Sequence, residues 1–220
     1  MALSSDGSIL VTGSVNKHIM IWCSTMEEPR QWHLQQTLVD GIKEVSSDGS
    51  VIMALSDVII IWRRTKNQPP RWTSRIMLPA QGNFESGSPV VLSPDGSSIA
   101  AGFENGDIII WDIASEEYHS RSNKTYKRLG LDLPVKLLAY SSNSSLLASN
   151  QNDRSVRVWG PSYITNEIQN YYCYSLDAGE HFYPTAISFS PNSELLVLGF
   201  SDGIIRIIDI TPQIPFCNRH

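Results

Sequence analysis

The chain has 220 residues, of which 41% are hydrophobic and 18% charged, so its composition suits a packed core and not a disordered protein. Its formal net charge of −5 argues against general binding along a phosphate backbone. No apolar run reaches the roughly 18 residues that span a bilayer, and the first residues lack the basic and apolar regions of a secretory signal. We therefore expect a protein of the cytoplasm or nucleus without membrane contact.

A repeated pattern begins at the first residues and continues to the end of the chain. Each copy starts with a short polar turn and ends, 16 to 18 residues later, in an apolar run that closes on a large residue. The turns begin at Ser4, Ser46, Ser93, Ser141 and Ser190, and the large residues are Trp22, Trp62, Trp111, Trp159 and Ile208. Five copies in one register predict a single repeat domain over 1–220, with units near 1–27, 40–66, 88–114, 135–160 and 184–211.

Within each copy the residues follow the pattern of β-strands. In the fourth copy Val156 and Val158 alternate with Ser155 and Arg157, as expected for a strand that follows a polar turn. Asn, Asp and Gly supply the turn chemistry of tight hairpins. No stretch of ten or more residues shows clear helical periodicity, so the sequence predicts an all-β chain.

The copies resemble WD repeats, the β-propeller family in which each repeat forms a four-stranded blade. The resemblance is clearest in SPDGSSIAAGFENGDIIIWDI, which starts at Ser93, and in SPNSELLVLGFSDGIIRIIDI, which starts at Ser190. The Trp-Asp ending of the family is complete only in Trp111-Asp112. The resemblance implies a WD40-type β-propeller of five recognisable four-stranded blades.

The resemblance also implies structural roles for particular residues. The family's turn Asp matches Asp153 and Asp202, while its buried Asp-His-Ser-Trp network is most nearly complete in the fourth copy, which has Asp153, Ser155 and Trp159 but no His. A buried Trp changed to Ala costs about 3 to 5 kcal/mol, more than the roughly 1 kcal/mol of one hydrogen bond. We therefore expect blade stability to rest mainly on burial of the tryptophans, Trp22, Trp62, Trp111 and Trp159.

The connecting segments are predicted to supply the fourth strand of each blade. Four such segments, around 30–39, 71–79, 124–131 and 170–176, serve five copies, and the two prolines that follow Ile210 suit a ladder strand poorly. Two alternatives follow: the five copies close as a small ring, or the chain is part of a larger propeller, seven blades being familiar in the family. We favour the second, in which the unpartnered ends would promote self-association.

The sequence contains one pattern that resembles a catalytic motif and none with the spacing of metal ligands. GFSDG, around Ser201, matches a nucleophile elbow, but a strand and not the required helix is expected after it. The scattered Cys23, Cys173 and Cys217 and the five histidines show no ligand spacing, so we expect reduced thiols, no metal and no cofactor. A hydrolase would use Asp177, Glu180 and His181. We expect no enzyme.

Partner binding is the function that the resemblance implies. In the family, ligands dock on the face formed by the turns between middle strands, and the residue before the turn Asp points there. The matching positions are Val15, Glu104, Asn152 and Ser201, with Ser56 less securely aligned, while Phe103 and Phe200 are expected to pack inward.

This mixed set of residues favours protein or peptide partners over nucleic acid. We therefore predict a non-catalytic protein–protein interaction scaffold, or a partner-sensing module of a larger signalling or assembly protein. The alternative is an RNA-binding propeller that uses the basic and aromatic residues of 63–75.

Overall fold

The computed structural model consists of β-strands joined by turns and links, and it contains no α-helix among the residues that it describes. These residues are 1–14, 18–24, 31–39, 42–55, 59–65, 71–78, 88–114, 126–130, 133–151, 155–161, 171–177 and 183–211. The chain divides into two compact units, and each is described by itself. Unit 1 comprises Met1–Phe84, Pro94–Ser98 and Asp112–Ser122, and unit 2 comprises Glu85–Ser93, Ile99–Trp111 and Asn123–His220.

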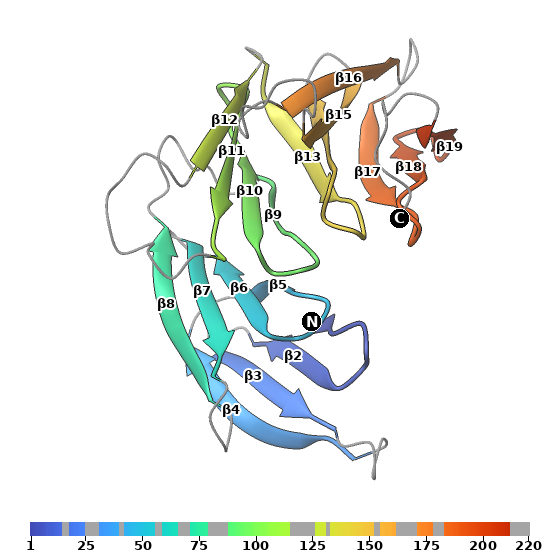
Figure 1. Ribbon diagram of the computed structural model, residues 1–220. Helices are drawn as coiled ribbons and strands as arrows, with labels where there is room; N and C mark the ends of the chain where they lie inside the picture. Colours follow the sequence, from blue (N-terminus) through green and yellow to red (C-terminus); the bar gives the residue numbers. More distant parts are fainter. Residues whose placement is uncertain are drawn as a thin grey trace. The chain divides into compact units, whose positions relative to one another are not determined.

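Unit 1 contains two four-stranded antiparallel sheets, in which each strand pairs with the next one along the chain (Figure 1). Sheet A consists of β1 (Ala2–Leu3), β2 (Ile9–Gly13), β3 (His18–Cys23) and β4 (His33–Val39). Sheet B consists of β5 (Ile42–Val45), β6 (Val51–Leu55), β7 (Ile59–Arg64) and β8 (Trp72–Leu78). Strands β4 and β8 lie in the segments that were predicted to supply fourth strands.

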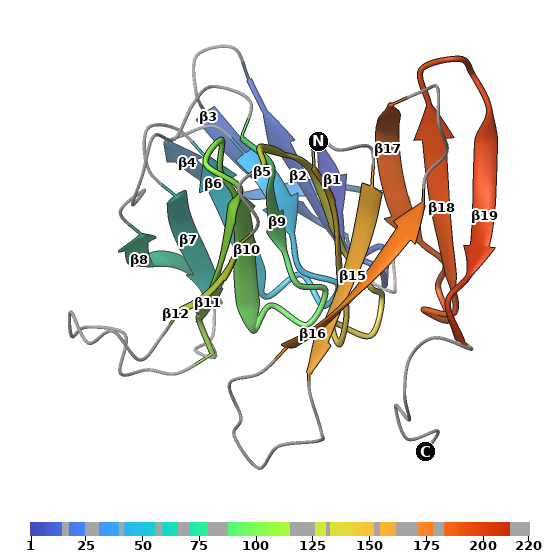
Figure 2. The same ribbon diagram turned by 90° about the horizontal axis from the view of Figure 1, so that it is seen from above.

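Unit 2 contains sheets D and E and nearly all of sheet C. Sheet C consists of β9 (Val90–Leu92), β10 (Ser98–Gly102), β11 (Asp107–Asp112) and β12 (Tyr126–Gly130). Sheet D consists of β13 (Val135–Tyr140), β14 (Leu147–Gln151), β15 (Ser155–Pro161) and β16 (Tyr171–Asp177). Sheet E has three strands, β17 (Pro184–Phe189), β18 (Leu195–Phe200) and β19 (Ile205–Asp209), with β19 at its edge (Figure 2). The all-β fold and all four predicted fourth strands are confirmed.

The polar turn that opens each copy is held by its own side chains. In sheet B, Ser46 Oγ donates to Asp48 Oδ1 at 2.7 Å and accepts from the Val51 N–H at 2.9 Å. Asp48 Oδ1 also accepts from the Ser50 N–H at 2.9 Å, and Gly49 takes the positive φ of 66° that closes the turn. The repeated Ser-x-Asp/Asn spacing therefore encodes one compact turn between the first two strands of a sheet.

Neighbouring turns are bonded to each other within each unit. In unit 1 the Ser5 N–H donates to the Ser47 carbonyl at 2.8 Å, and the Ser47 N–H donates to the Pro94 carbonyl at 2.7 Å. In unit 2 Ser142 Oγ donates to the Ser190 carbonyl at 3.1 Å. These bonds join neighbouring turns within each unit.

The core of unit 1 lies between sheets A and B. Ile9, Val11, Ile19 and Ile21 of sheet A are fully buried against sheet B. At the outer strands, Gln36 links β4 to β8 through a reciprocal pair of bonds, because its Oε1 accepts from the Trp72 N–H at 2.9 Å while its Nε2 donates to the Trp72 carbonyl at 3.1 Å.

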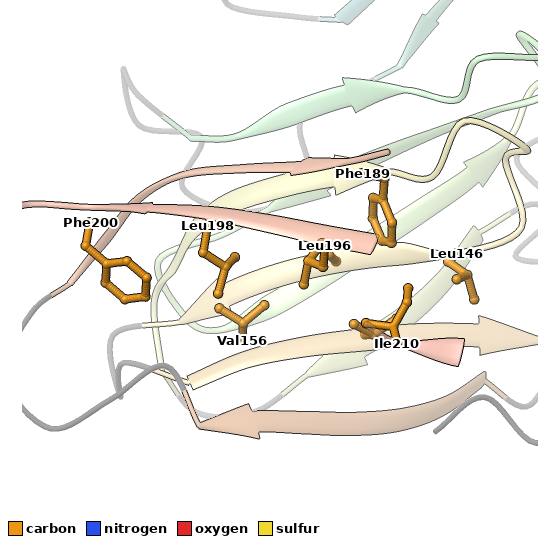
Figure 3. Packing of buried hydrophobic residues seen from close by; sticks show 9 residues of the cluster. Leu146, Val156, Phe189, Leu196, Leu198, Phe200 and Ile210 are labelled. Atoms are coloured by element: carbon orange, nitrogen blue, oxygen red, sulfur yellow. The ribbon is translucent and has the colours of Figure 1, made fainter. Parts of the chain in front are cut away.

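Unit 2 has two such cores. Between sheets C and D, Ile108 and Ile110 pack with Trp159. Between sheets D and E, Val156 and Leu146 pack with a set from sheet E that Figure 3 shows in close contact, namely Phe189, Leu196, Leu198, Phe200 and Ile210. Each core is therefore formed by two adjacent sheet faces of alternating apolar residues.

Trp62 and Trp159 pack into these interfaces, and Trp22 and Trp159 each donate a hydrogen bond that the sequence did not predict. Trp159 Nε1 donates to Ser149 Oγ at 2.8 Å, and Trp22 Nε1 donates to Thr12 Oγ1 at 3.0 Å. Ala54 stands at the matching position in sheet B, and the buried Nε1 of Trp62 has no hydrogen-bond partner in the described part of the chain. The indole partner is therefore a hydroxyl on the neighbouring strand.

Candidate protein-interaction face

Two of the four predicted binding residues, Glu104 and Ser201, lie in described turns of unit 2. Glu104 is in the β10–β11 turn and Ser201 is in the β18–β19 turn, at matching positions of the repeat. Val15 and Asn152 lie outside the described residues, as do Ser56 and the predicted structural residue Asp153. Ser155 is the first residue of β15.

The β10–β11 turn is fixed from three sides. Asn105 Oδ1 accepts from the Asp107 N–H at 3.1 Å, which tightens the turn itself. The Phe103 carbonyl accepts from the Val135 N–H at 3.1 Å, which fastens the turn to the start of β13, and the Phe103 side chain is buried as predicted. Gln151 Nε2 donates to the Gly106 carbonyl at 3.4 Å from the end of β14. Glu104 is therefore presented from a rigid support.

An exposed ion pair joins this turn to the next sheet. Lys136 Nζ lies 2.8 Å from Glu104 Oε1, and the two side chains are 48% and 39% exposed, respectively. Pairs at this exposure contribute about 0 to 1 kcal/mol to stability because water screens them. The pair contributes more to the arrangement of charge on the surface than to folding.

The β18–β19 turn repeats the same construction. Asp202 Oδ1 accepts from the Ile204 N–H at 3.0 Å, which is the role that Asn105 plays in sheet C. The Ser201 N–H donates to the Tyr183 carbonyl at 3.2 Å, fastening the turn to the residue before β17. Phe200 is buried and packs beneath Arg206, whose guanidinium carbon lies 5.1 Å from the ring centroid.

These elements occupy one end of the sheets of unit 2. Strands β9, β13 and β17 are neighbours, so the residues at the starts of β13 and β17 lie at the end where the middle-strand turns are found. We define the turn face of unit 2 by five residues at this end that are at least partly exposed and lie beside the exposed Asn105, Asp202 and Ile204; they are Glu104, Leu133, Lys136, Tyr183 and Ser201. The sequence did not point to Leu133, Lys136 or Tyr183, although Lys136 faces outward in the strand alternation of β13.

Of the residues that a catalytic site would use, the structure describes Ser201 and Asp177. Ser201 is followed by the strand β19 and not by the helix of a nucleophile elbow. Of the hydrolase candidates, Glu180 and His181 lie outside the described residues and Asp177 ends β16. Burial raises the pKa of the free Cys23 thiol, although the charge of Arg64 acts in the opposite direction. The raised pKa disfavours the nucleophilic thiolate form of Cys23.

The described residues contain neither a metal-binding cluster nor a membrane-spanning helix. No group of three or more His, Cys, Asp or Glu side chains among them could hold a metal ion. None of them forms a helix long and apolar enough to cross a membrane.

The basic segment 63–75 has a structural role at both of its described ends. Arg63 Nη2 donates to the Ile113 carbonyl at 2.6 Å and to the Gly96 carbonyl at 3.3 Å, all within unit 1. Trp72 is buried in the core between sheets A and B. These two side chains are used internally, whereas Arg64 and Arg71 are exposed.

The sequence matches the WD40 family, described as "WD domain, G-beta repeat", over residues 1–23, 90–112, 132–160 and 174–209, just over half of the chain. The chain belongs to the WD40 repeat family. Sheets A, C, D and E contain the matched regions, and sheet B has the same four-stranded order although its strands lie outside them. The sheets of this WD40 chain are therefore blades, and five of them are recognisable.

Three curated relatives share 27% to 30% of aligned residues with this WD40 chain. WD repeat-containing protein 90 of Xenopus tropicalis is 27% identical over 122 residues, covering 56% of this chain and 6% of the relative. Small ribosomal subunit protein RACK1z of Oryza sativa subsp. japonica is 27% identical over 124 residues, covering 56% and 34%. WD repeat-containing protein 70 of Xenopus laevis is 30% identical over 140 residues, covering 56% and 21%. The chain thus spans about a third or less of the length of these relatives.

Proposed function

We propose that this WD40 chain is a non-catalytic protein-interaction scaffold that binds protein or peptide partners at the turn face of unit 2, as a module of a signalling or assembly protein. The observation that carries the proposal is the combination of an exposed Tyr183 and Leu133 with the exposed Glu104–Lys136 pair on turns fixed by backbone bonds. Aromatic anchors beside paired charges on a rigid support are typical of protein interfaces. Family membership supports the same conclusion, because WD40 blades present loops on a rigid frame.

The binding face is tested by affinity capture with the 220-residue chain and three variants. Lys136→Glu places two carboxylates side by side, and Tyr183→Ala removes the aromatic anchor. Pro191→Ala alters an exposed residue at the opposite end of β18 and serves as the control. We expect a set of captured proteins, quantified by mass spectrometry, to be lost with the first two variants and retained with the control. Equal capture by all four proteins would contradict the proposal.

The RNA-binding alternative is separated from it by fluorescence anisotropy with a labelled single-stranded RNA at two salt concentrations. We expect no binding, since Arg63 and Trp72 are used inside unit 1. Affinity that falls steeply with salt would favour the alternative.

A further inference from the structure

The β10–β11 turn contains the one Asn-Gly pair of the sequence, Asn105-Gly106. Asparagine is chemically labile, because the backbone nitrogen of the next residue can attack its side-chain carbonyl carbon. A side chain on that next residue hinders the approach, and glycine has none. Asn105 is exposed to water, which the reaction consumes. The turn therefore combines the reactive pair with access to the co-reactant.

Hydrogen bonds hold both ends of the Asn105 side-chain amide. Its Oδ1 accepts from the Asp107 N–H at 3.1 Å, which polarises the carbonyl toward attack at Cγ. Its Nδ2 donates to Asp107 Oδ2 at 2.7 Å, so a carboxylate lies beside the nitrogen that must leave. A carboxylate in this position can pass a proton to the departing nitrogen.

The attacking nitrogen is held by the fold. The Gly106 N–H donates to the Phe103 carbonyl at 3.0 Å, and the Gly106 carbonyl accepts from Gln151 Nε2 at 3.4 Å. Attack requires the first of these bonds to open, so the folded chain reacts more slowly than the unfolded chain. A single bond in a surface turn opens at a much lower cost than the whole domain unfolds. The reaction is therefore expected to proceed in the folded chain.

We propose that Asn105 is a self-modification site, at which the folded chain converts a side-chain amide into a carboxyl. The Gly106 nitrogen loses its proton and bonds to Asn105 Cγ, while the Cγ–Nδ2 bond breaks and Nδ2 leaves as ammonia with that proton. Water then opens the cyclic imide: its oxygen stays in the new carboxyl, and a proton returns to the Gly106 nitrogen. Opening at Cγ gives aspartate, and opening at the backbone carbonyl carbon gives isoaspartate. Water is the only co-reactant.

The β18–β19 turn indicates that the aspartate product fits this kind of turn. Asp202-Gly203 stands at the matching position, and Asp202 Oδ1 accepts a backbone N–H at 3.0 Å as Asn105 Oδ1 does at 3.1 Å. Gly106 and Gly203 have φ values of 85° and 86°. The new carboxyl is ionised at neutral pH, so the conversion adds one negative charge beside Glu104 on the turn face of unit 2.

Asn192, in the β17–β18 turn, is a matched comparison within the same chain. It is also exposed; its Oδ1 accepts from the Glu194 N–H at 3.3 Å, and its Nδ2 donates to Glu194 Oε2 at 2.7 Å. The next residue is Ser193, whose N–H donates to the Ser190 carbonyl at 2.8 Å. The hydrogen bonds of the two asparagines correspond, and the Cβ of Ser193 is the feature that the Asn105 site lacks.

The test incubates the 220-residue chain in mildly alkaline buffer made with water enriched in heavy oxygen. Digestion in ordinary water at acidic pH and peptide mass spectrometry then show which asparagines became acids and took up heavy oxygen. Asn105→Asp supplies the aspartate product as a chromatographic standard. Ser193→Gly, with its fold checked by a thermal melt, places a glycine after Asn192. A sample in urea gives the rate in the unfolded chain.

We expect Asn105 of the folded chain to convert at least about tenfold faster than Asn192, which corresponds to a barrier lower by about 1.4 kcal/mol. In Ser193→Gly the rate at Asn192 should approach the rate at Asn105. Equal rates at the two asparagines of the unmodified chain would overturn the proposal. An Asn105 that remains an amide while the urea sample converts would also overturn it. The measurement needs no binding partner, so this proposal and the proposed binding function fail independently.

Discussion

The polar turns of sheets A, B and C share their hydrogen-bond geometry with those of sheets D and E but not their chemistry. In the first group the acceptor is a carboxylate and the positive φ falls on glycine, whereas in the second the acceptor is an amide and the positive φ falls on serine. The acceptors are Asp6, Asp48 and Asp95 against Asn143 and Asn192, and the positive-φ residues are Gly7, Gly49 and Gly96 against Ser144 and Ser193.

This difference shows that the acceptor oxygen determines the shape of the turn, whereas the charge of the carboxylate determines its response to pH. An oxygen at this position is enough for the bonds, whether or not it is charged. The charge adds a response to pH: hydrogen bonds from Ser4 and then Ser8 lower the pKa of Asp6 to about 2. Burial acts to raise the pKa of Asp48, but hydrogen bonds from Ser46 and Ser50 outweigh it and the pKa is lowered.

The largest expected effect comes from placing a side chain on a glycine of the first group. In Gly96→Ala the new Cβ must adopt a φ of 68° and would lie 2.8 Å from Val51 Cγ2, so we expect a loss of about 2 to 3 kcal/mol in the free energy of unfolding. Urea denaturation measures it. Gly7→Ala is the control, because its φ is 71° but nothing lies within 4 Å, and about 1 kcal/mol is expected. Equal losses would show that Val51 gives way.

The second effect tests whether the carboxylate strengthens its turn. Ser46 and Ser141 are both fully buried, and each hydroxyl donates to the acceptor and accepts a backbone N–H. We expect Ser46→Ala to cost about 2 kcal/mol and Ser141→Ala about 1 kcal/mol at pH 7, since hydrogen bonds to charged groups are stronger. Urea denaturation of both variants at pH 7 gives the comparison. A larger cost for Ser141→Ala would contradict the role assigned to charge.

The third effect is the pH dependence of the first group. A carboxyl with a lowered folded pKa stabilises the fold above its unfolded pKa of 3.8, and this contribution is lost as the pH falls through the folded pKa. We expect Asp48→Asn, which keeps the acceptor oxygen, to flatten the decline in melting temperature as the pH falls below the unfolded pKa of 3.8. The change in free energy is about 1 kcal/mol at most, because water screens the turn. An unchanged dependence of melting temperature on pH would show that other groups cause the acid sensitivity.

The smallest effect comes from replacing the positive-φ serines of the second group with glycine, which removes their backbone strain. Ser144 has a φ of 61°, so Ser144→Gly is expected to stabilise the chain by about 0.5 kcal/mol in a thermal melt. Ser193→Gly is the comparison, because Ser193 Oγ accepts from the Asn143 N–H at 3.2 Å and its removal cancels the gain. A gain of equal size in both would show that this bond contributes little.

The sequence predicted the sheets well because their signals are local. Alternation of apolar and polar residues identified the strands, and β-forming residues in 30–39, 71–79, 124–131 and 170–176 identified the outer ones. The sequence analysis missed the indole hydrogen bonds, although Thr12 and Ser149 supply hydroxyls at the position where sheet B has Ala54.

The candidate site was predicted only in part, because its partners come from adjacent sheets. Glu104 and Ser201 follow from the repeat, but Lys136 meets Glu104 across 32 residues, and no spacing within a copy reveals that contact. Arg63 was misleading for the same reason. Its charge suggested a role in binding RNA, but its guanidinium donates to two backbone carbonyls that lie 33 and 50 residues away in the sequence.

The series of hydrogen bonds between the turns of unit 1 stops at Pro94. Ser5 donates to Ser47 and Ser47 to Pro94, but a proline has no N–H to pass the connection on. These two amides sit in surface turns and yet are bonded to the neighbouring turn, so solvent deuterium should replace their protons only when adjacent blades separate. Hydrogen exchange at Ser5 and Ser47 would therefore report blade separation without the unfolding of either sheet.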